Sequence, residues 1–151
     1  MPNDTTYPQD RLQLHQDGTA FQPSFMGFGS GDDAGLIIKS DSLSATDATR
    51  VTLIATRAMQ LTSVKISFTT ASSSGTVTVE KLTGTTAPGS GTVLLTTPLL
   101  LSGTANTVQS GVLIATLASL QLAAGDRFGI VIAGTMTNLV GGMISTEFAP
   151  I

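Results

Sequence analysis

The feature that most constrains the fold of this chain is the punctuation of its sequence from Gly35 onward. Short runs rich in β-branched residues alternate with clusters of Gly, Ser, Asn and Pro. β-branched residues favour strands, and the clustered residues favour turns, so this pattern is typical of an all-β protein. No segment has the length and the 3.6-residue period of a long helix. We therefore expect strands joined by turns.

Two neighbouring runs show the alternation of a half-buried strand most clearly. In residues 61–70, apolar side chains such as Val64 and Ile66 fall on one face, and Ser and Lys fall on the other. Residues 76–82 alternate in the same way, and a turn rich in Ser and Gly at 71–75 separates the two runs. The sequence therefore predicts that they pair as a hairpin.

The remaining runs complete a predicted set of about eight or nine strands. The glycine-rich residues 84–91 are expected to be a long flexible connection, and 117–122 fit either a short helix or, as we favour, a strand. The number and spacing of the runs predict an antiparallel two-sheet β-sandwich of jelly-roll or related Greek-key type. The other candidate strands are 35–39, 50–57, 92–95, 98–101, 111–117, 127–133 and 140–148.

The first part of the chain has a different character. Residues 1–33 carry proline, glycine and an irregular scatter of apolar side chains with no sustained period. Three of the six Phe residues, Phe21, Phe25 and Phe28, lie in this short stretch. Solvated tails usually contain few aromatic residues. We therefore expect an extended N-terminal arm with a Gly-rich hinge, which docks on its own domain or on a neighbour, followed by a β-sandwich domain at 34–151.

Composition limits the chemistry that the chain can perform. It has no Cys and a single His, His15, which exclude disulfides, thiolate catalysis, cysteine-ligated metals and a multi-histidine centre from one chain. The net charge of −3 argues against binding of a phosphate backbone, which needs clustered Lys and Arg. We expect no cofactor, no metal and no nucleic-acid partner.

A membrane location is also not expected, although the mean hydropathy is +0.31. The longest apolar run, around 99–101, is far shorter than the ~18–20 residues of a spanning helix. Residues 1–4 lack the basic and apolar regions that begin a secretory signal. The sequence predicts a soluble chain, intracellular at synthesis and unprocessed.

Two motifs in the N-terminal part resemble sites. The glycines of 27–35 could cradle a phosphate, and Asp32 and Asp33 could bind calcium, but the expected helix, lysine and alternating acids are missing. A hinge between arm and sandwich is the better interpretation. His15 could form a triad with Asp10 or Asp17, but no nucleophile elbow is present, and a solvated or interface histidine is expected.

Three acidic residues in 36–151 could have a chemical role. Glu80 and Glu147 could serve a glycosidase as a carboxylate pair, but nothing places them in one cleft, and we expect surface ionic residues at strand ends. Sugar stacking usually needs exposed Trp or Tyr, and the chain has no Trp and only Tyr7. Asp126, after Gly125, is expected to accept backbone N–H bonds at a corner between strands. No enzymatic activity is expected.

The sequence resembles small virion proteins of tailed bacteriophages, namely capsid decoration or cement proteins and their head-fibre relatives. The resemblance covers about residues 48–150. It rests on four stretches, which are Leu-Thr-Ser-Val at 61–64, Gly-Thr-Val-Thr-Val-Glu-Lys-Leu-Thr-Gly at 75–84, Ala-Ala-Gly-Asp-Arg-Phe-Gly at 123–129 and Gly-Thr-Met-Thr-Asn-Leu at 134–139. It implies a β-rich homotrimer on the outer surface of the capsid, made in the host cytoplasm, with arms that reach onto the major capsid protein.

These observations lead to a functional hypothesis. We expect a structural protein that stabilises the assembled head by bridging coat subunits, and the alternative is a head- or tail-fibre module that binds host-surface glycans. Phe21, Phe25, Met26 and Phe28 are the candidate residues for capsid or inter-subunit contact, unless they cover an open end of their own sandwich. The weakly charged C-terminal half suits packing between identical subunits.

Overall fold

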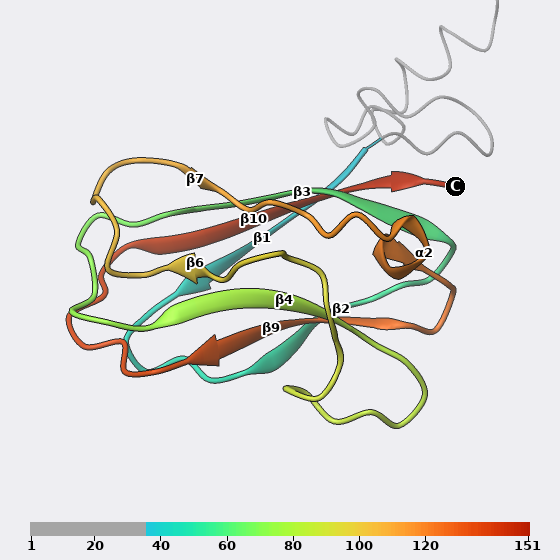
Figure 1. Ribbon diagram of the computed structural model, residues 1–151, viewed down its shortest axis with the longest axis horizontal. Helices are drawn as coiled ribbons and strands as arrows, with labels where there is room; N and C mark the ends of the chain where they lie inside the picture. Colours follow the sequence, from blue (N-terminus) through green and yellow to red (C-terminus); the bar gives the residue numbers. More distant parts are fainter. Residues whose placement is uncertain (1–35) are drawn as a thin grey trace, which may run out of the picture. The chain divides into compact units, whose positions relative to one another are not determined.

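The computed structural model describes residues 36–151, which form two antiparallel sheets stacked as a β-sandwich (Figure 1). The predicted all-β class is therefore confirmed, and the described part contains a single helix of four residues. The elements are β1 (Ile37–Leu43), β2 (Arg50–Ile54), β3 (Met59–Ser67), β4 (Thr76–Leu82), β5 (Thr92–Val93), β6 (Leu99–Leu100), β7 (Gln109–Ser110), α2 (Leu117–Leu120), β8 (Gln121–Leu122), β9 (Arg127–Ala133) and β10 (Gly142–Pro150).

The strand pairing is nested around the middle of the chain. β1 pairs with β10, β2 with β9, β3 with β7 and β8, and β4 with β5 and β6. The first sheet has the order β1-β10-β3-β7, with β8 also on β3, and the second has the order β2-β9-β4-β5, with β6 also on β4. The first four strands therefore alternate between the two sheets.

The predicted hairpin of 61–70 and 76–82 is wrong, because β3 lies in the first sheet and β4 in the second. The connecting segment crosses between the sheets, and the buried Ser72 hydroxyl fastens it by donating to the carbonyls of Thr135 (3.3 Å) and Thr137 (3.0 Å). Alternation in the sequence shows which face of a strand is buried. It carries no information about which strand lies alongside.

The segment before β9 also differs from the prediction. The predicted strand at 111–117 is wrong, because β7 ends at Ser110 and pairing within 111–117 is limited to an isolated bridge at Leu113. Residues 117–122 contain both predicted alternatives, because α2 leads directly into β8. The Lys81 ammonium donates to the carbonyls of Ala118 (3.3 Å) and Gln121 (3.0 Å), which satisfies acceptors at the end of the helix.

The hydrophobic core fills the space between the sheets. Phe128 of β9 and Phe148 of β10 meet edge to face at its centre, with ring centroids 5.1 Å apart, and so join the two layers. Full burial of one such side chain contributes about 1.5–3 kcal/mol. The predicted inward face of β3 is confirmed, because Val64 and Ile66 are buried. The core thus holds the sheets together without disulfides, since the chain has no cysteine.

Candidate functional site

The residues expected to make capsid or inter-subunit contact lie outside the described part of the chain. These residues are Phe21, Phe25, Met26 and Phe28. The glycine-rich stretch 27–35, the proposed boundary at 33/34 and His15 with its two neighbouring aspartates lie outside it as well, so all of these stay predictions. The sites that can be built from contacts belong to the sandwich.

Glu80 and Glu147, the possible carboxylate pair of a glycosidase, lie in different sheets. Glu147 is half-buried in β10, where its cross-strand neighbours are Ile38 and Ser63. Glu80 lies in β4 of the second sheet, and only 1% of it is exposed. Its neighbours Val79 and Leu82 are buried too, so Glu80 is not the surface residue that the sequence predicts.

Glu80 is buried beneath the loop between β4 and β5, residues 83–91, which we call the clamped loop. One carboxylate oxygen, Oε1, accepts the backbone N–H of Gly89 at 2.7 Å, and Oε2 accepts that of Gly91 at 2.8 Å. Hydrogen bonds to an ionised group are roughly twice as strong as neutral ones. The clamped loop therefore lies against the sheet and is not the free connection that the sequence predicts.

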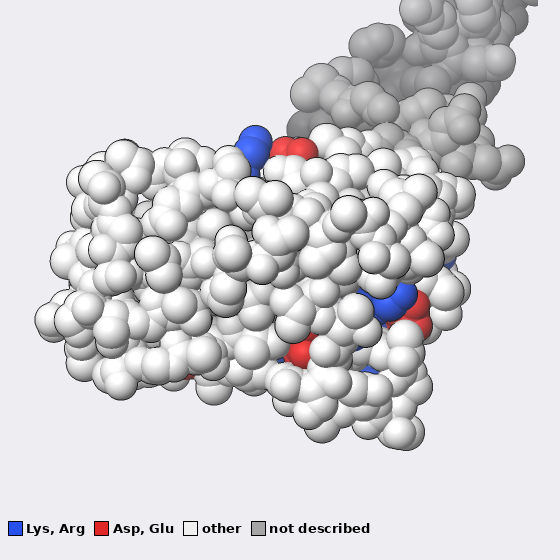
Figure 2. Space-filling model, in the orientation of Figure 1, with Lys and Arg blue, Asp and Glu red and all other residues white. Residues whose placement is uncertain are grey.

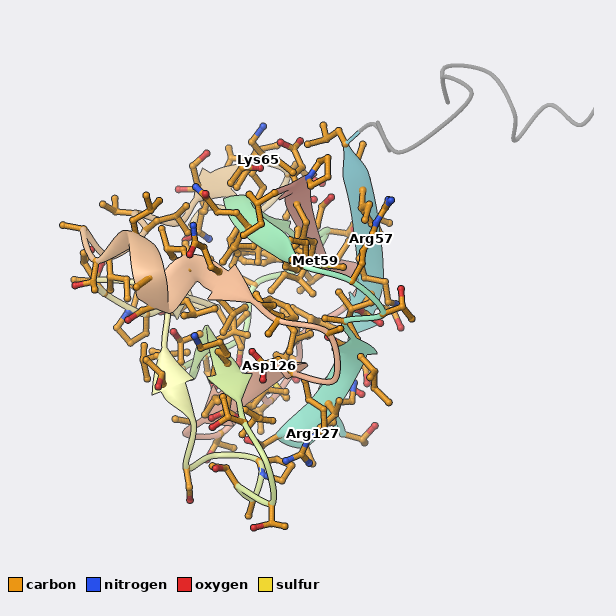
Figure 3. All side chains as sticks on the ribbon, turned by 90° about the vertical axis from the view of Figure 1, so that its right-hand side faces the viewer. Arg57, Met59, Lys65, Asp126 and Arg127 are labelled. Atoms are coloured by element: carbon orange, nitrogen blue, oxygen red, sulfur yellow. The ribbon has the colours of Figure 1, made fainter. Side chains whose placement is uncertain are left out.

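A second charged side chain holds the other half of the clamped loop. The Arg127 guanidinium at the start of β9 donates to the carbonyls of Gly84 (2.9 Å) and Thr86 (2.7 Å). A carboxylate thus satisfies the donors of this loop and a guanidinium satisfies its acceptors. In the end-on view, Arg127 lies in the lower sheet and Lys65 on the outer side of the upper one (Figure 3).

Gly129 makes room for the buried carboxylate. It lies directly opposite Glu80 in the β4–β9 pairing. A Cβ atom at Gly129 would come within 3.0 Å of the Arg50 carbonyl oxygen and 3.2 Å of Glu80 Oε1. The sequence signal for this buried carboxylate is Glu80 in one strand, Gly129 in the facing strand, and two glycines, at 89 and 91, in the loop that follows Glu80. It is visible only once the register is known.

The predicted corner after β8 is confirmed. Asp126 Oδ2 accepts the backbone N–H of Ala123 at 2.9 Å, and Gly125 has a φ of +91°, which favours glycine. The corner is joined to the end of β2, because the Gly125 N–H donates to the Ala55 carbonyl (2.7 Å) and the Ala55 N–H to that of Asp126 (2.8 Å). Asp126 therefore has a structural role, in keeping with the sequence.

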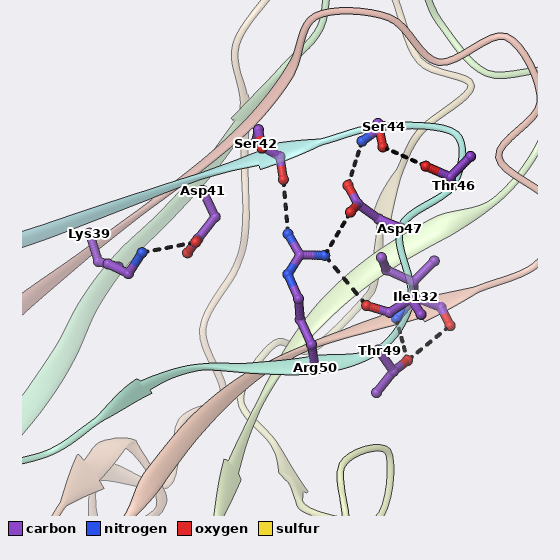
Figure 4. Close-up of polar contacts among 10 residues, drawn as sticks. Lys39, Asp41, Ser42, Ser44, Thr46, Asp47, Thr49, Arg50 and Ile132 are labelled. Carbon is purple, nitrogen blue, oxygen red and sulfur yellow. Dashed lines mark hydrogen bonds and ion pairs between the residues drawn. The ribbon is translucent and has the colours of Figure 1, made fainter.

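One edge of the sandwich, formed by β1 and β2, carries ion pairs (Figure 4). Lys39 and Asp41 of β1 pair at 2.8 Å, and Arg50 of β2 pairs with Asp47 at 3.2 Å. The Arg50 guanidinium also donates to the Ser42 carbonyl at 2.9 Å, which ties β2 to β1 across the two sheets. This edge is held by charge, although Ile38 and Ile54 of the same two strands are exposed apolar side chains.

The opposite edge is closed by hydrogen bonds between uncharged segments. We call residues 92–120, which run from β5 to α2, the uncharged flank. The Thr96 N–H donates to the Val112 carbonyl at 2.8 Å, and the Ile114 N–H donates to the Leu94 carbonyl at 3.0 Å. These bonds bridge the two sheets along the side where β6 and β7 lie (Figure 1).

The uncharged flank is part of a longer stretch without ionisable side chains. Residues 82–125 contain no Asp, Glu, Lys, Arg or His. The space-filling view of this side is mostly free of charged atoms, which appear at its upper edge and in its lower right part (Figure 2). Five large apolar side chains of the flank are nevertheless exposed, namely Val93, Leu100, Val108, Val112 and Leu117.

Two further observations concern cofactors and membranes. Within residues 36–151, acidic and histidine side chains form no group of three or more that could hold a metal ion. The same part of the chain has no helix of the length and apolar character that would cross a bilayer.

Comparison with known proteins gives no relative, because no family model, no curated protein and no solved structure matches the chain. The function is therefore argued from the residues and surfaces described above.

Proposed function

We propose that this chain is a structural protein of a bacteriophage virion that binds the outer capsid surface and stabilises the assembled head. In this proposal it is a non-enzymatic homotrimer, made in the host cytoplasm, whose partner is the major capsid protein. Its action is to bridge neighbouring coat subunits as a decoration or cement protein. The resemblance in residues 48–150 suggested this function, and the distribution of charge supports it.

The observation that carries the proposal is the separation of charged and uncharged surface on one small sandwich. Ion pairs lie along β1 and β2, whereas residues 92–120 on the opposite flank contribute no ionisable group. Exposed apolar side chains occur on both sides, so the difference between the two sides is one of charge. Surfaces of soluble domains usually carry about 25–35% charged residues. Cores of protein interfaces are depleted of charge. A protein whose uncharged flank packs against other subunits, while its β1–β2 edge stays in water, would have this distribution of charge.

The N-terminal arm supplies the capsid contact in this proposal. Phe21, Phe25, Met26 and Phe28 are the apolar anchors, because a few large side chains usually dominate binding energy. Residues 1–35 contain five Asp and one Arg, whereas residues 36–151 contain five acidic and six basic residues. The arm therefore carries the negative charge of the chain, and a basic patch on the coat protein would attract it.

We also propose that the sandwich is a jelly roll. In such a fold a long antiparallel pair of chain halves wraps into two sheets. The nested pairing of β1 with β10, β2 with β9 and β4 with β5 and β6 supports this assignment. An experimental structure that retained this strand order would support the jelly roll, and a different order would remove it.

Stabilisation by this protein would follow from linkage. A ligand that binds the assembled shell but not free coat subunits stabilises the shell by about 2.7 kcal/mol per site at a hundred times its dissociation constant. The chain needs no reactive group for this effect. It needs only a surface that matches neighbouring coat subunits in their assembled positions.

Co-sedimentation with empty heads of the virus that encodes the chain tests the proposal. We expect the full chain to sediment with heads, to saturate at a fixed ratio to coat protein and to stay unbound with dissociated coat subunits. Replacement of Phe21, Phe25 and Phe28 by Ser in the full chain should abolish binding while the sandwich stays folded. A chain that ignores heads, and that instead binds a host glycan on an array, would favour the fibre alternative.

A further inference from the structure

We propose that the uncharged flank, residues 92–120, is the surface through which copies of this chain bind one another. The inference deepens the proposed homotrimer and rests on it. It assigns self-association to one side of the sandwich and leaves the β1–β2 edge outside the subunit contact.

The side chains of the flank are those of an interface. Leu100 and Val112 are 55% and 62% exposed. Both lie in the stretch 82–125, which has no ionisable side chain. Their apolar surface would leave water in a contact, which contributes about 25 cal/mol for each Å² buried. Residues 92–120 contain no ionisable side chain, so a contact made by these residues desolvates no ionised group of their own. Two lysines of neighbouring strands adjoin the flank, because Lys65 lies opposite Ser110 of β7 and the Lys81 ammonium donates to the Ala118 carbonyl of α2.

The backbone of the flank limits the kind of contact. Thr96 and Ile114 already use their N–H groups in the bonds that close the sandwich, and Gln109 Nε2 donates to the Leu100 carbonyl at 2.9 Å. A partner at these positions would therefore pack against side chains and would not add a strand to the sheet. This favours a folded protein surface over an extended peptide as the occupant.

A second copy is the occupant that the charge pattern favours. Charged patches usually steer and select different partners, and the flank has no charge with which to select one. In a trimer each contact joins two different parts of the subunit surface. Where both parts belong to residues 92–120, no like charges of these residues meet. The described body has six basic and five acidic residues, and its near neutrality adds little repulsion between copies.

The flank contains several elements of the sandwich, as a contact between folded subunits requires. A stable contact buries about 800 Å² on each partner. The flank includes β5, β6, β7 and α2 and runs along the length of the sandwich (Figure 1). Its exposed apolar residues are spread from Val93 to Leu117 and are not confined to one loop tip.

Analytical ultracentrifugation of the full chain tests the assignment. We expect the native protein to sediment at three times its 15.4 kDa chain mass. Val112→Lys and Leu100→Lys should each raise the dissociation constant about 100-fold or more, because an unpaired ammonium would be buried in the contact. Both side chains are exposed in the single subunit, so its fold should tolerate the change.

Ile54→Lys is the control, because Ile54 is apolar and 60% exposed but lies at the end of β2 on the opposite side. It should leave the oligomer intact. The assignment is overturned if the native chain is monomeric up to about 100 μM, a range in which contacts weaker than about −5 kcal/mol escape detection. It is also overturned if flank variants stay trimeric, or if Ile54→Lys dissociates the trimer equally.

Thiol labelling gives a second measurement that does not depend on a disruptive substitution. The chain has no cysteine, so Val112→Cys and Ile54→Cys each introduce a single thiol. In the oligomer, maleimide should modify the thiol at 112 at least ten times more slowly than the thiol at 54. Equal rates at the two positions would contradict the assignment even if the Lys variants failed to fold.

The same variants separate this inference from the proposed function. Native chain that forms trimers through the flank but ignores heads would retain the inference and remove the capsid function. Native chain that binds heads, with flank variants that stay trimeric, would retain the function and remove the inference.

Discussion

A single residue, Glu80, holds the clamped loop on the second sheet. Glu80 is buried at 1% exposure, and both of its oxygens accept backbone N–H groups of the clamped loop. A buried carboxylate without such donors would be strongly destabilising. Gly129 opposite and Gly91 above leave the space that the carboxylate fills. One acid, Glu80, and three glycines, at 89, 91 and 129, therefore form this cluster.

Glu80→Gln should therefore destabilise the protein by about 2–3 kcal/mol, because the amide loses the charge and presents a donor to one of the two N–H groups. Urea unfolding followed by circular dichroism measures this change. Glu147→Gln is the control, since Glu147 is half-buried on a strand and has no comparable donors, and it should change stability by less than about 0.5 kcal/mol. Equal effects of the two substitutions would refute the role of Glu80.

Asp126 and Glu80 show what sequence can reveal at this scale. The side-chain carboxylate of Asp126 accepts the N–H of Ala123, three residues away, so the local pattern of Gly125 followed by an acid predicts this bond. The role of Glu80 depends on a strand partner nearly fifty residues away in sequence and on a loop that folds back. No local pattern distinguishes it from a solvated strand residue.

Among the elements, the clamped loop depends on charge at its two ends. Arg127 holds the carbonyls of Gly84 and Thr86, and Glu80 holds the amides farther along. Loss of one anchor should open the loop locally, because loops can unfold independently of the core.

Arg127→Met should accelerate amide hydrogen exchange in residues 83–91 at least about tenfold while the core strands stay protected. Methionine retains much of the length of the side chain but not its donors. Mass spectrometry of peptic fragments measures the exchange. Arg57→Met is the comparison, because Arg57 is exposed and lies away from the loop, on the side of β1 (Figure 3). Unchanged exchange in the Arg127 variant would show that Glu80 alone suffices.

Among residues 36–151, the β1 strand is one of the two edge strands of the first sheet, and β7 is the other. Its Lys39 and Asp41 lie opposite the buried Thr146 and Ile144, so they are on the side that faces the core. Inward charges on an edge strand discourage pairing with other chains, because such pairing would bury them. The ion pair at 2.8 Å makes this arrangement tolerable in the folded subunit.

Lys39→Val combined with Asp41→Val should therefore promote aggregation, since the edge would become apolar on its inner side. Static light scattering over time at fixed concentration measures it. Ser40→Val combined with Ser42→Val changes the outward side of the same strand and should have a smaller effect. Equal aggregation of the two double variants would contradict the protective role of the ion pair.

Strand positions were predictable from the sequence, but strand partners were not. Alternation located β3 and β4 and the buried face of β3, because burial in a sandwich imposes a period of two. The run at 127–133 was predicted as a strand without a buried face, and it is β9. The predicted hairpin of β3 and β4 failed because both strands have one apolar face and fit either sheet. The partners depend on closing the long nested pairs, such as β1 with β10, which local residues cannot specify.

At the scale of the whole molecule, the sandwich of residues 36–151 has a charged edge and an uncharged flank, and three of the six Phe residues lie in residues 1–35. The low charge of the sequence could indicate poor solubility or an interface. The structure concentrates the ion pairs on the β1–β2 edge and the exposed apolar residues of 92–120 on the other. The arm residues Phe21, Phe25, Met26 and Phe28 stay a prediction from sequence.

The central claim is that the chain stabilises an assembled shell by binding it more tightly than free coat subunits. Titration of empty heads with the full chain, followed by their disassembly temperature in a scattering melt, tests it most directly. We predict that this temperature rises with chain concentration, and continues to rise logarithmically above the dissociation constant. A disassembly temperature that stays constant at concentrations at which the heads are fully decorated would contradict the claim.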